Sequence, residues 1–190
     1  MKKLYVIAGP NGAGKTTLSY TILPEIFECD EFINADEIAR GISPLNPEKA
    51  AIRAGRLMIE RLNELIVNKE SFAFETTLSS RAYRQLINRA KSLGYDVTLL
   101  FLCLESVELA IERVKTRVLE GGHDIPTEVI KRRYLNGITN FFTIYQPLAN
   151  NWVVVDNSSD KFEFIAQSNN GKLNVSNKKK WSDLNEKYGI

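Results

Sequence analysis

Cysteine and histidine are scarce in this sequence of 190 residues, which has two Cys and one His. Cys29 and Cys103 lie far apart, and neither belongs to a Cys-x-x-Cys pair, so the sequence predicts neither a disulfide framework nor a zinc site. His123 has no second histidine as a partner. The composition therefore argues against a Cys/His metal centre and against a histidine-based catalytic triad.

Long hydrophobic runs and a strong charge bias are also absent. No stretch approaches the roughly 18 apolar residues of a membrane span, and the apolar run at residues 4–8 is too short for the core of a signal peptide. The 25 Lys and Arg against 23 Asp and Glu leave a net charge of +2, which argues against a nucleic-acid coat or a membrane-binding basic arm. We expect a cytoplasmic protein without a membrane partner.

Short apolar runs alternate with longer segments of helical period. Runs typical of buried strands occupy residues 4–8, 72–74, 97–102 and 152–155, with a weaker candidate at 32–33. Helical patterns cover residues 47–68, about 81–93, a segment that begins near Ser106, and about 127–149. This alternation predicts an α/β fold in which a parallel β-sheet is covered by helices on both faces.

The chain changes character after residue 158. The alternating residues 162–166, a turn at 169–172 and residues 173–175 predict an edge β-hairpin, and a polar C-terminal helix is expected from Lys178 onward. Because domains usually have about 100–200 residues, we expect one domain over residues 1–190. It would comprise a core at 1–158 and an edge hairpin with a C-terminal helix at 159–190.

The segment Gly9-Pro10-Asn11-Gly12-Ala13-Gly14-Lys15-Thr16, followed by Thr17, has the spacing of a phosphate-binding loop. Its glycines let successive backbone N–H groups point at phosphate oxygens. Lys15 is expected to meet the β- and γ-phosphates, and Thr16 offers a hydroxyl to Mg²⁺. A helix that begins near Gly14 would direct its positive end at the same charge. The loop therefore predicts binding of ATP or GTP with Mg²⁺.

Phosphate loops are shared by kinases, GTPases, motors and transporter ATPases, so the function has to be inferred from the other motifs. The sequence contains no Leu-Ser-Gly-Gly-Gln segment and no strand that ends in Asp-Glu, which argues against a transporter ATPase of the ABC class. It also lacks the Asn-Lys-x-Asp segment of Ras-like GTPases. The remaining motifs favour a small-molecule kinase.

Two carboxylates follow predicted strands, at the sheet edge where α/β proteins bind ligands. Asp36 lies just beyond residues 32–33, where it could accept the proton of an attacking hydroxyl or hold Mg²⁺ through water. Glu75, Thr76 and Thr77 follow residues 72–74 and present a carboxylate and two hydroxyls, which suit a polyhydroxylated acceptor or support of the metal. Two other interpretations stay open, a helix N-cap for Asp36 and strand-end capping for Glu75 and Thr76.

A group of arginines predicts a helical lid. Arg113 and Arg117 lie one helical turn apart, and a glycine-containing loop at 121–126 separates them from Arg132 and Arg133. Kinases use arginines to neutralise the transferring phosphoryl group. Arg132 and Arg133 are about 100° apart on a helix, so we expect only one to face the site, and Arg133 is our candidate. The alternative is that these arginines lie on solvated helix faces.

Two further segments each allow two interpretations. His123, in the predicted lid loop, either contacts the substrate or packs the lid. Asp156-Asn157-Ser158 follows the last predicted parallel strand, where P-loop kinases often bind the edge of adenine. A turn built from turn-forming residues explains this segment equally well.

Together these motifs resemble the short bacterial members of the zeta toxin family over about residues 3–158. The segments that carry the resemblance are the phosphate loop, Asn34-Ala35-Asp36, Glu75-Thr76-Thr77, the Gly-Gly-His-Asp-Ile-Pro at 121–126, Arg132-Arg133-Tyr134 and Asp156-Asn157-Ser158. The resemblance implies a kinase fold and ATP-dependent phosphorylation of UDP-N-acetylglucosamine at the sugar 3′-hydroxyl. It also implies an antitoxin protein as a partner.

The resemblance further implies roles for single residues. Lys15 and Thr16 would bind ATP and Mg²⁺, and Asp36 would be the general base. Glu75 would be the carboxylate that binds the acceptor. Arg113 and Arg117 would lie in the region of the phosphate-clamping arginines.

We therefore expect an ATP-dependent kinase that acts on a hydroxylated small molecule, with UDP-N-acetylglucosamine as the first candidate. A kinase of another metabolite, of a nucleoside or of a polynucleotide 5′-hydroxyl is the nearer alternative. An ATP-binding regulatory module that hydrolyses slowly is an alternative of a different class. Only the kinase requires both Asp36 and the lid arginines near the γ-phosphate.

Overall fold

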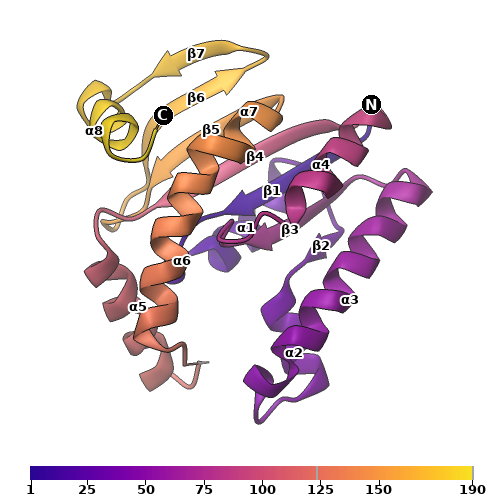
Figure 1. The fold of residues 1–190 in the computed structure, drawn as a ribbon, viewed down its shortest axis with the longest axis vertical. Coiled ribbons are helices and arrows are strands. Elements are labelled where there is room, and N and C mark those ends of the chain that lie inside the picture. The colour runs from indigo at the N-terminus through magenta and orange to yellow at the C-terminus, as the bar shows by residue number, and fades with distance from the viewer. Residues whose placement is uncertain (123, 190) are drawn as a thin grey trace.

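A computed structural model describes residues 1–122 and 124–189 and contains one seven-stranded sheet in the order β2-β3-β1-β4-β5-β6-β7 (Figure 1). The first five strands of that order are parallel. The strands are β1 (Lys3–Ala8), β2 (Phe32–Ile33), β3 (Phe72–Thr76), β4 (Asp96–Cys103), β5 (Asn151–Asp156), β6 (Glu163–Asn169) and β7 (Lys172–Val175). The predicted α/β fold with a mainly parallel sheet is thus confirmed.

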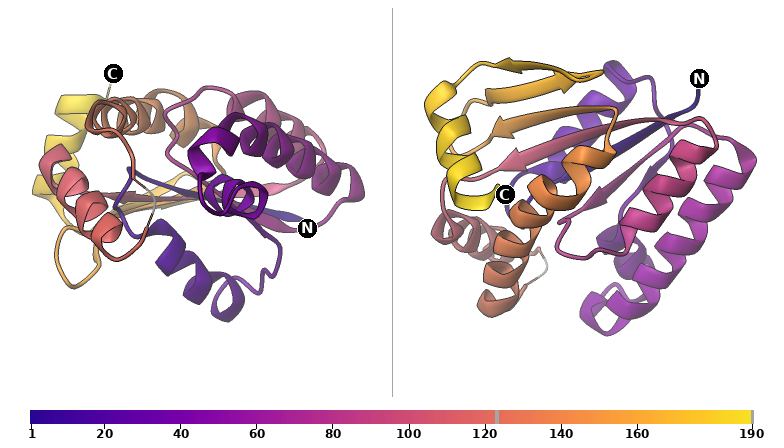
Figure 2. Two further views of the ribbon diagram at one scale, coloured as in Figure 1. Left: turned by 90° about the horizontal axis from the view of Figure 1, so that it is seen from below. Right: turned by 45° about the horizontal axis from the view of Figure 1, so that its top comes forward.

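Helices cover both faces of the sheet, as the view in Figure 2 (left) shows. They are α1 (Lys15–Glu25), α2 (Ala35–Ile42), α3 (Pro47–Asn68), α4 (Tyr83–Ser92), α5 (Val107–Leu119), α6 (Thr127–Asn140), the π-helical turn η1 (Phe141–Tyr145), α7 (Gln146–Leu148) and α8 (Lys178–Tyr188). One core lies under α3, α4 and η1, and the other lies under α1 and α5. None of the helices in the described part of the chain has the length and apolar character needed to cross a membrane.

The central strand β1 explains why this sequence forms a sheet that is buried on both faces. Its residues alternate between the two cores, with Leu4, Val6 and Ala8 in one and Tyr5 and Ile7 in the other. All five are buried, so the strand appears in the sequence as a continuous apolar run. Because β1 lies between β3 and β4, the loop that follows it occupies the point where the chain switches direction across the sheet.

The C-terminal residues form the predicted edge hairpin and helix. Strands β6 and β7 pair antiparallel across Asn170 and Gly171, which both have positive φ angles, of 47° and 81°. Two such residues make the tight turn that suits the twist of a hairpin. Helix α8 is anchored by Trp181, whose ring stacks on Trp152 with ring centroids 5.3 Å apart.

The prediction of one continuous α-helix over residues 127–149 was wrong. The helix changes register at η1, where the N–H of Gln146 donates to the carbonyl of Phe141, five residues earlier. Pro147 follows immediately and has no N–H with which to continue an α-helical ladder. Apolar periodicity gives no sign of such a register change, because the buried residues on either side stay apolar.

Candidate functional site

A cavity of about 450 Å³ opens at the carboxyl ends of β1, β2 and β3, with α2 on one side and α5 and α6 on the other. Of the predicted site residues, those that line it are Asn11, Gly12, Gly14, Lys15, Thr16, Thr17, Asp36, Glu75, Thr76, Arg113, Arg117 and Arg133. Gly9, Pro10 and Ala13 are buried beneath the loop surface. His123 lies outside the described residues.

The phosphate loop turns around glycines with positive φ angles. Gly9 has a φ of 144°, and a Cβ there would lie only 2.2 Å from the carbonyl oxygen of Leu102 on β4. Gly14 adopts φ 78° directly before α1, so the helix begins at Lys15. The first turn of α1 therefore points its N–H groups into the cavity, an arrangement that favours a bound anion. No other residue type fits these two positions without strain.

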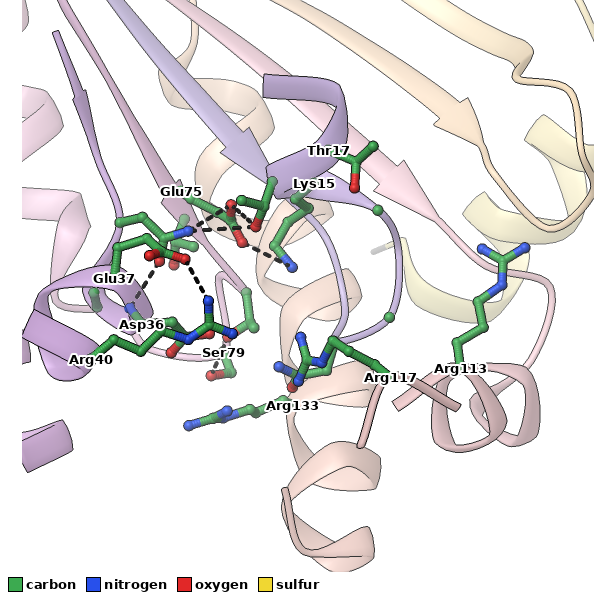
Figure 3. A pocket seen from close by; sticks show the side chains of 18 of the residues that line it. Lys15, Thr17, Asp36, Glu37, Arg40, Glu75, Ser79, Arg113, Arg117 and Arg133 are labelled. Atoms are coloured by element: carbon green, nitrogen blue, oxygen red, sulfur yellow. Dashed lines mark hydrogen bonds and ion pairs between the residues drawn. The ribbon is translucent and has the colours of Figure 1, made fainter. Parts of the chain in front are cut away.

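Lys15, Thr16 and Glu75 form a cluster at the floor of the cavity (Figure 3). The Lys15 ammonium donates to the Pro10 carbonyl at 3.0 Å and lies 3.6 Å from a Glu75 oxygen. The other Glu75 oxygen accepts from the Thr16 hydroxyl at 2.7 Å and from the Asn34 amide at 3.1 Å. Lys15 is only 6% exposed, so its charge is held in a largely dehydrated place beside the loop.

The oxygen atoms of the same cluster suit a magnesium ion. Mg²⁺ prefers oxygen ligands and is usually held by one or two carboxylates together with substrate phosphates and water. The Thr16 hydroxyl, 2.7 Å from Glu75, offers one such ligand, and Asp36 lines the same cavity. Thr16 is thus the candidate ligand, and Glu75 is placed to accept hydrogen bonds from water around the ion.

Asp36 lies in the first turn of α2, but it is not the residue that caps this helix. The Asn34 side chain is the N-cap and accepts a hydrogen bond from the Asp36 N–H at 2.8 Å. Among the residues that the structure describes, the Asp36 carboxylate has no hydrogen-bond or ion-pair partner, and it is exposed to the cavity. The N-cap interpretation of Asp36 was therefore wrong, and its carboxylate is available to a ligand.

The lid arginines fall into two groups. Arg117 and Arg133 extend their side chains into the cavity, with Arg117 next to the phosphate loop, whereas the side chain of Arg113 points away from Lys15 (Figure 3). Arg133 lines the cavity and its exposed neighbour Arg132 does not, in line with the expected 100° separation on a helix.

The geometry of Arg113 differs from that of the predicted phosphate clamp. Its guanidinium donates to the carbonyls of Asn157 and Ser158, at 2.6 and 3.0 Å. These two bonds direct the side chain toward the loop that follows β5. A clamp role for Arg113 stays a prediction that would require its guanidinium to leave these carbonyls.

The loop after β5 joins the phosphate loop to the C-terminal helix. The Asn157 amide donates to the Ala13 carbonyl at 2.9 Å, and the Lys180 ammonium on α8 lies 2.5 Å from the Asp156 carboxylate. Burial alone would raise the pKa of Asp156, but hydrogen bonds from Lys180 and Ser158 outweigh it and lower the pKa below its ordinary value. Asp156 is therefore a charged anchor for this loop at neutral pH.

Several residues of the cavity were not predicted from the sequence as site residues. They are Asn34, Ala35, Glu37, Arg40, Ser79, Ser80 and Tyr83, whereas Thr77 lines the cavity as its place beside Glu75 and Thr76 predicted. Two signals could have indicated some of them. Arg40 follows Asp36 by four residues and so shares its helix face, and the two serines continue the polar run that starts at Glu75. Tyr83 gave no such signal, and burial raises the pKa of its hydroxyl, which stays neutral.

Asn11 in the phosphate loop carries a polar group without a partner. The residue is 5% exposed and lines the cavity, and its side-chain oxygen makes no hydrogen bond within the described residues. A buried amide without a partner costs free energy. A bound ligand with complementary polar atoms would remove this cost, which supports the cavity as a ligand site.

Comparison with known proteins agrees with the predicted fold and family. A protein of Haemophilus influenzae (strain ATCC 51907 / DSM 11121 / KW20 / Rd) whose function is uncharacterised is 36% identical over 143 residues, which cover 70% of this chain and 98% of that protein. The AvrRxo1-ORF1:-ORF2 complex solved with ATP contains a chain with a TM-score of 0.74 and 17% identity. This match covers 97% of the present chain but only 63% of the AvrRxo1 chain.

Two further solved structures share the fold. One comes from the PezAT toxin-antitoxin system of Streptococcus pneumoniae, with a TM-score of 0.68, 14% identity, and coverage of 100% of this chain and 78% of that one. The other is a gluconokinase from Sinorhizobium meliloti 1021, with a TM-score of 0.53, 18% identity and 83% coverage of each chain. The architecture is therefore that of a P-loop kinase. The model of the zeta toxin family matches residues 1–170, so the chain belongs to the zeta toxin family.

Proposed function

We propose that this protein is an ATP-dependent kinase that transfers the γ-phosphoryl group to a hydroxyl of a small molecule, with UDP-N-acetylglucosamine as the first candidate acceptor. One observation carries the proposal. The exposed Asp36 carboxylate, which has no partner in the described part of the chain, shares one cavity with Lys15 and with Arg117 and Arg133. Nucleotide binding alone would not require a carboxylate opposite two arginines.

The floor of the cavity would hold the nucleotide. Backbone N–H groups of the loop and the Lys15 ammonium would bind the β- and γ-phosphates, and the Thr16 hydroxyl would ligate Mg²⁺. When bound, the ion neutralises charge on the phosphates during transfer. Glu75 accepts from Thr16 and Asn34 and keeps these side chains in place. In this proposal Glu75 serves the nucleotide side of the cavity as well as the acceptor.

The chemical step needs few protein groups. The acceptor hydroxyl gives its proton to Asp36 as its oxygen bonds to the γ-phosphorus, and the bond from that phosphorus to the β–γ bridging oxygen breaks to release ADP. Arg117 and Arg133 would meet the charge that spreads over the transferring phosphoryl group. Phosphoryl transfer depends mainly on positioning and charge neutralisation, which this set of side chains can provide.

The acceptor would lie on the α2 side of the cavity. We name residues 76–80 the acceptor loop, because its hydroxyl side chains Thr76, Thr77, Ser79 and Ser80 line the same cavity as Asp36 and Arg40. Hydroxyls and an arginine suit a sugar that also carries phosphate. The family also supports an antitoxin as a protein partner.

The deciding experiment incubates the protein with γ-³²P-labelled ATP, Mg²⁺ and UDP-N-acetylglucosamine, beside a panel of gluconate, shikimate, nucleosides and a 5′-hydroxyl oligonucleotide. We expect label on UDP-N-acetylglucosamine, with the 3′-hydroxyl identified by NMR. Label on another member of the panel would retain the kinase and replace the acceptor. ATP hydrolysis without transfer to any member would contradict the proposal and favour a regulatory ATPase.

A further inference from the structure

The acceptor loop adopts a strained backbone conformation. Leu78 at its centre has a φ of 54°, in the left-handed region that a branched residue rarely occupies. Its side chain is fully buried, and its N–H donates to the Thr76 hydroxyl at 3.1 Å. Conformations of this kind are strained and persist only where surrounding contacts enforce them.

The enforcing contacts come from one helix more than fifty residues further along the chain. The buried Asn140 amide donates to the Leu78 carbonyl at 2.8 Å. The Tyr145 hydroxyl donates to the Ser80 carbonyl at 2.5 Å. Gly137 lies against the same loop, because a Cβ there would be 2.3 Å from the Thr77 carbonyl oxygen. Two backbone carbonyls of one short loop are thus held by hydrogen bonds from a single helical element, and a third lies packed against it.

The π-helical turn makes this contact pattern feasible. In an α-helix, residues five apart point about 140° away from each other, so Asn140 and Tyr145 would face different surroundings. A π turn instead joins residue i+5 to the carbonyl of residue i, which widens the turn and brings the two residues closer to one side of the helix, and η1 occupies the residues between Asn140 and Gln146. Both side chains therefore reach the acceptor loop.

We propose that Asn140 and Tyr145 are positioning residues, which act through the acceptor loop to hold its hydroxyls at the acceptor. This inference rests on the proposed function. Packing alone requires the Tyr145 ring, which is 1% exposed, but it does not require the hydroxyl or the Asn140 amide. Both polar groups instead donate to carbonyls beside Ser79, which lines the cavity.

The first test compares Tyr145→Phe with Tyr95→Phe. Both variants lose a buried tyrosine hydroxyl that bonds to backbone carbonyls, but Tyr95 contacts Leu65 and Glu70, away from the cavity. Loss of such a bond is worth about 0.5–1.5 kcal/mol, so kcat/KM for UDP-N-acetylglucosamine should fall about 3- to 10-fold in Tyr145→Phe. The Kd of Mg-ATP should stay unchanged, and Tyr95→Phe should keep the wild-type kcat/KM. Equal kinetic changes in the two variants would overturn the inference.

Hydrogen exchange supplies a second test that needs no acceptor. Backbone amides of residues 78–82 should exchange faster in Tyr145→Phe than in the wild type, and Tyr95→Phe should leave them unchanged. Unchanged exchange in Tyr145→Phe would overturn the positioning role of Tyr145 even if the protein is an active kinase. If the wild type prefers another acceptor, the kinetic comparison uses that acceptor. A wild type that phosphorylates none of the panel overturns the proposed function instead, and with it the acceptor role of the loop.

Asn140→Leu removes the amide with little change in size, and it should lower kcat/KM for the acceptor further than Tyr145→Phe does. Should this variant not fold, Tyr145→Phe alone decides the question. A folded Asn140→Leu with wild-type acceptor kinetics would also overturn the inference.

Discussion

The two loops that face each other across the cavity obtain their shapes in different ways. The phosphate loop, residues 9–16, turns on its own glycines and closes with bonds to its own backbone, such as that from Lys15 to Pro10. The acceptor loop contains no glycine, and its strained centre at Leu78 is held by Asn140 and Tyr145. The turns of the phosphate loop are therefore encoded mainly by its own residues, whereas the conformation of the acceptor loop depends on contacts with a distant part of the chain.

This difference has a consequence for specificity. A local motif keeps its shape in many sequence contexts, which is why the same phosphate loop serves enzymes with different activities. A loop held from a distant helix changes when that helix changes. Variants at the nucleotide end should therefore abolish function outright, and those at the acceptor end should alter the choice and affinity of the acceptor.

The largest effect is expected for Lys15→Met. Lys15 is the only lysine among the described residues that line the cavity. Loss of its ammonium should bring phosphoryl transfer below detection and weaken Mg-ATP binding about 10- to 100-fold. The melting temperature should change little, because Glu75 keeps its bonds to Thr16 and Asn34. Calorimetric titration beside a melting curve measures both. Wild-type affinity and turnover in Lys15→Met would contradict the assignment of the phosphate loop.

Asp36→Asn should have the next largest effect. Asparagine keeps the size of the side chain but cannot accept the proton, so transfer should fall about 10²–10⁴-fold while Mg-ATP binding persists. Because Asn34 is the N-cap, the variant loses only a helix-dipole contribution of about 0.3–1 kcal/mol. Glu108→Gln, in the first turn of α5, is the control for that contribution. The measurement is the single-turnover rate of phosphoryl transfer at saturating ATP. A rate equal to that of the wild type would shift the search for the general base to Glu75.

Arg117→Gln and Arg113→Gln should separate the two arginine groups. Arg117→Gln should lower kcat and kcat/KM together by about 10-fold or more, as expected for a side chain that binds the transition state more strongly than the ground state. Arg113→Gln should instead raise the KM for ATP, because it loses its bonds to Asn157 and Ser158. The control is Arg132→Gln, which replaces the exposed residue next to Arg133 and should leave kcat and KM unchanged. If Arg113→Gln lowers kcat as Arg117→Gln does, Arg113 reaches the phosphates during turnover.

Sequence patterns predicted those parts of the molecule that depend on local chemistry. The apolar strands, the glycine turn of the phosphate loop and the Asn170-Gly171 hairpin each follow from the preferences of neighbouring residues. The carboxyl ends of parallel strands then placed Asp36 and Glu75 at one sheet edge, as expected.

The patterns failed where neighbouring residues suit the same role equally well and where distant contacts decide. Nothing near Asp36 in the sequence indicates that Asn34 takes the capping role, because both residue types cap helices well. The direction of Arg113 depends on carbonyls 44 and 45 residues away along the chain. The π turn and the αL conformation of Leu78 lie in segments that are far apart in the sequence and contact each other through Asn140, so neither segment alone predicts the contact.

The smallest expected effect tests whether the phosphate loop also depends on helix α8, which lies far from it in the sequence. Lys180 on α8 pairs with Asp156 at 2.5 Å and with Glu163 at 2.7 Å, and Asp156 also accepts from Ser158 in the loop that contacts the phosphate loop. Lys180→Met keeps the apolar stem and removes the charge. Because the Lys180 side chain is 41% exposed, the loss should be only about 1 kcal/mol of unfolding free energy, or about 2–4 °C in melting temperature.

The pH dependence identifies the source of that loss. The folded state lowers the pKa of Asp156, so its contribution is present above the ordinary Asp value of about 3.9 and disappears as pH falls through the lower folded value. The folded state raises the pKa of Lys180, so the alkaline loss comes only above the ordinary Lys value of about 10.4. Urea unfolding should show a constant difference in the free energy of unfolding between wild type and Lys180→Met from about pH 5 to 9, and this difference should shrink at pH 3.

The control is Lys179→Met, which replaces an exposed lysine in the same helix and should leave the free energy of unfolding unchanged at every pH. A difference that persists at pH 3 would assign the effect to packing of the lysine stem, and a rise in the KM for ATP at neutral pH would show that α8 supports the nucleotide end from a distance.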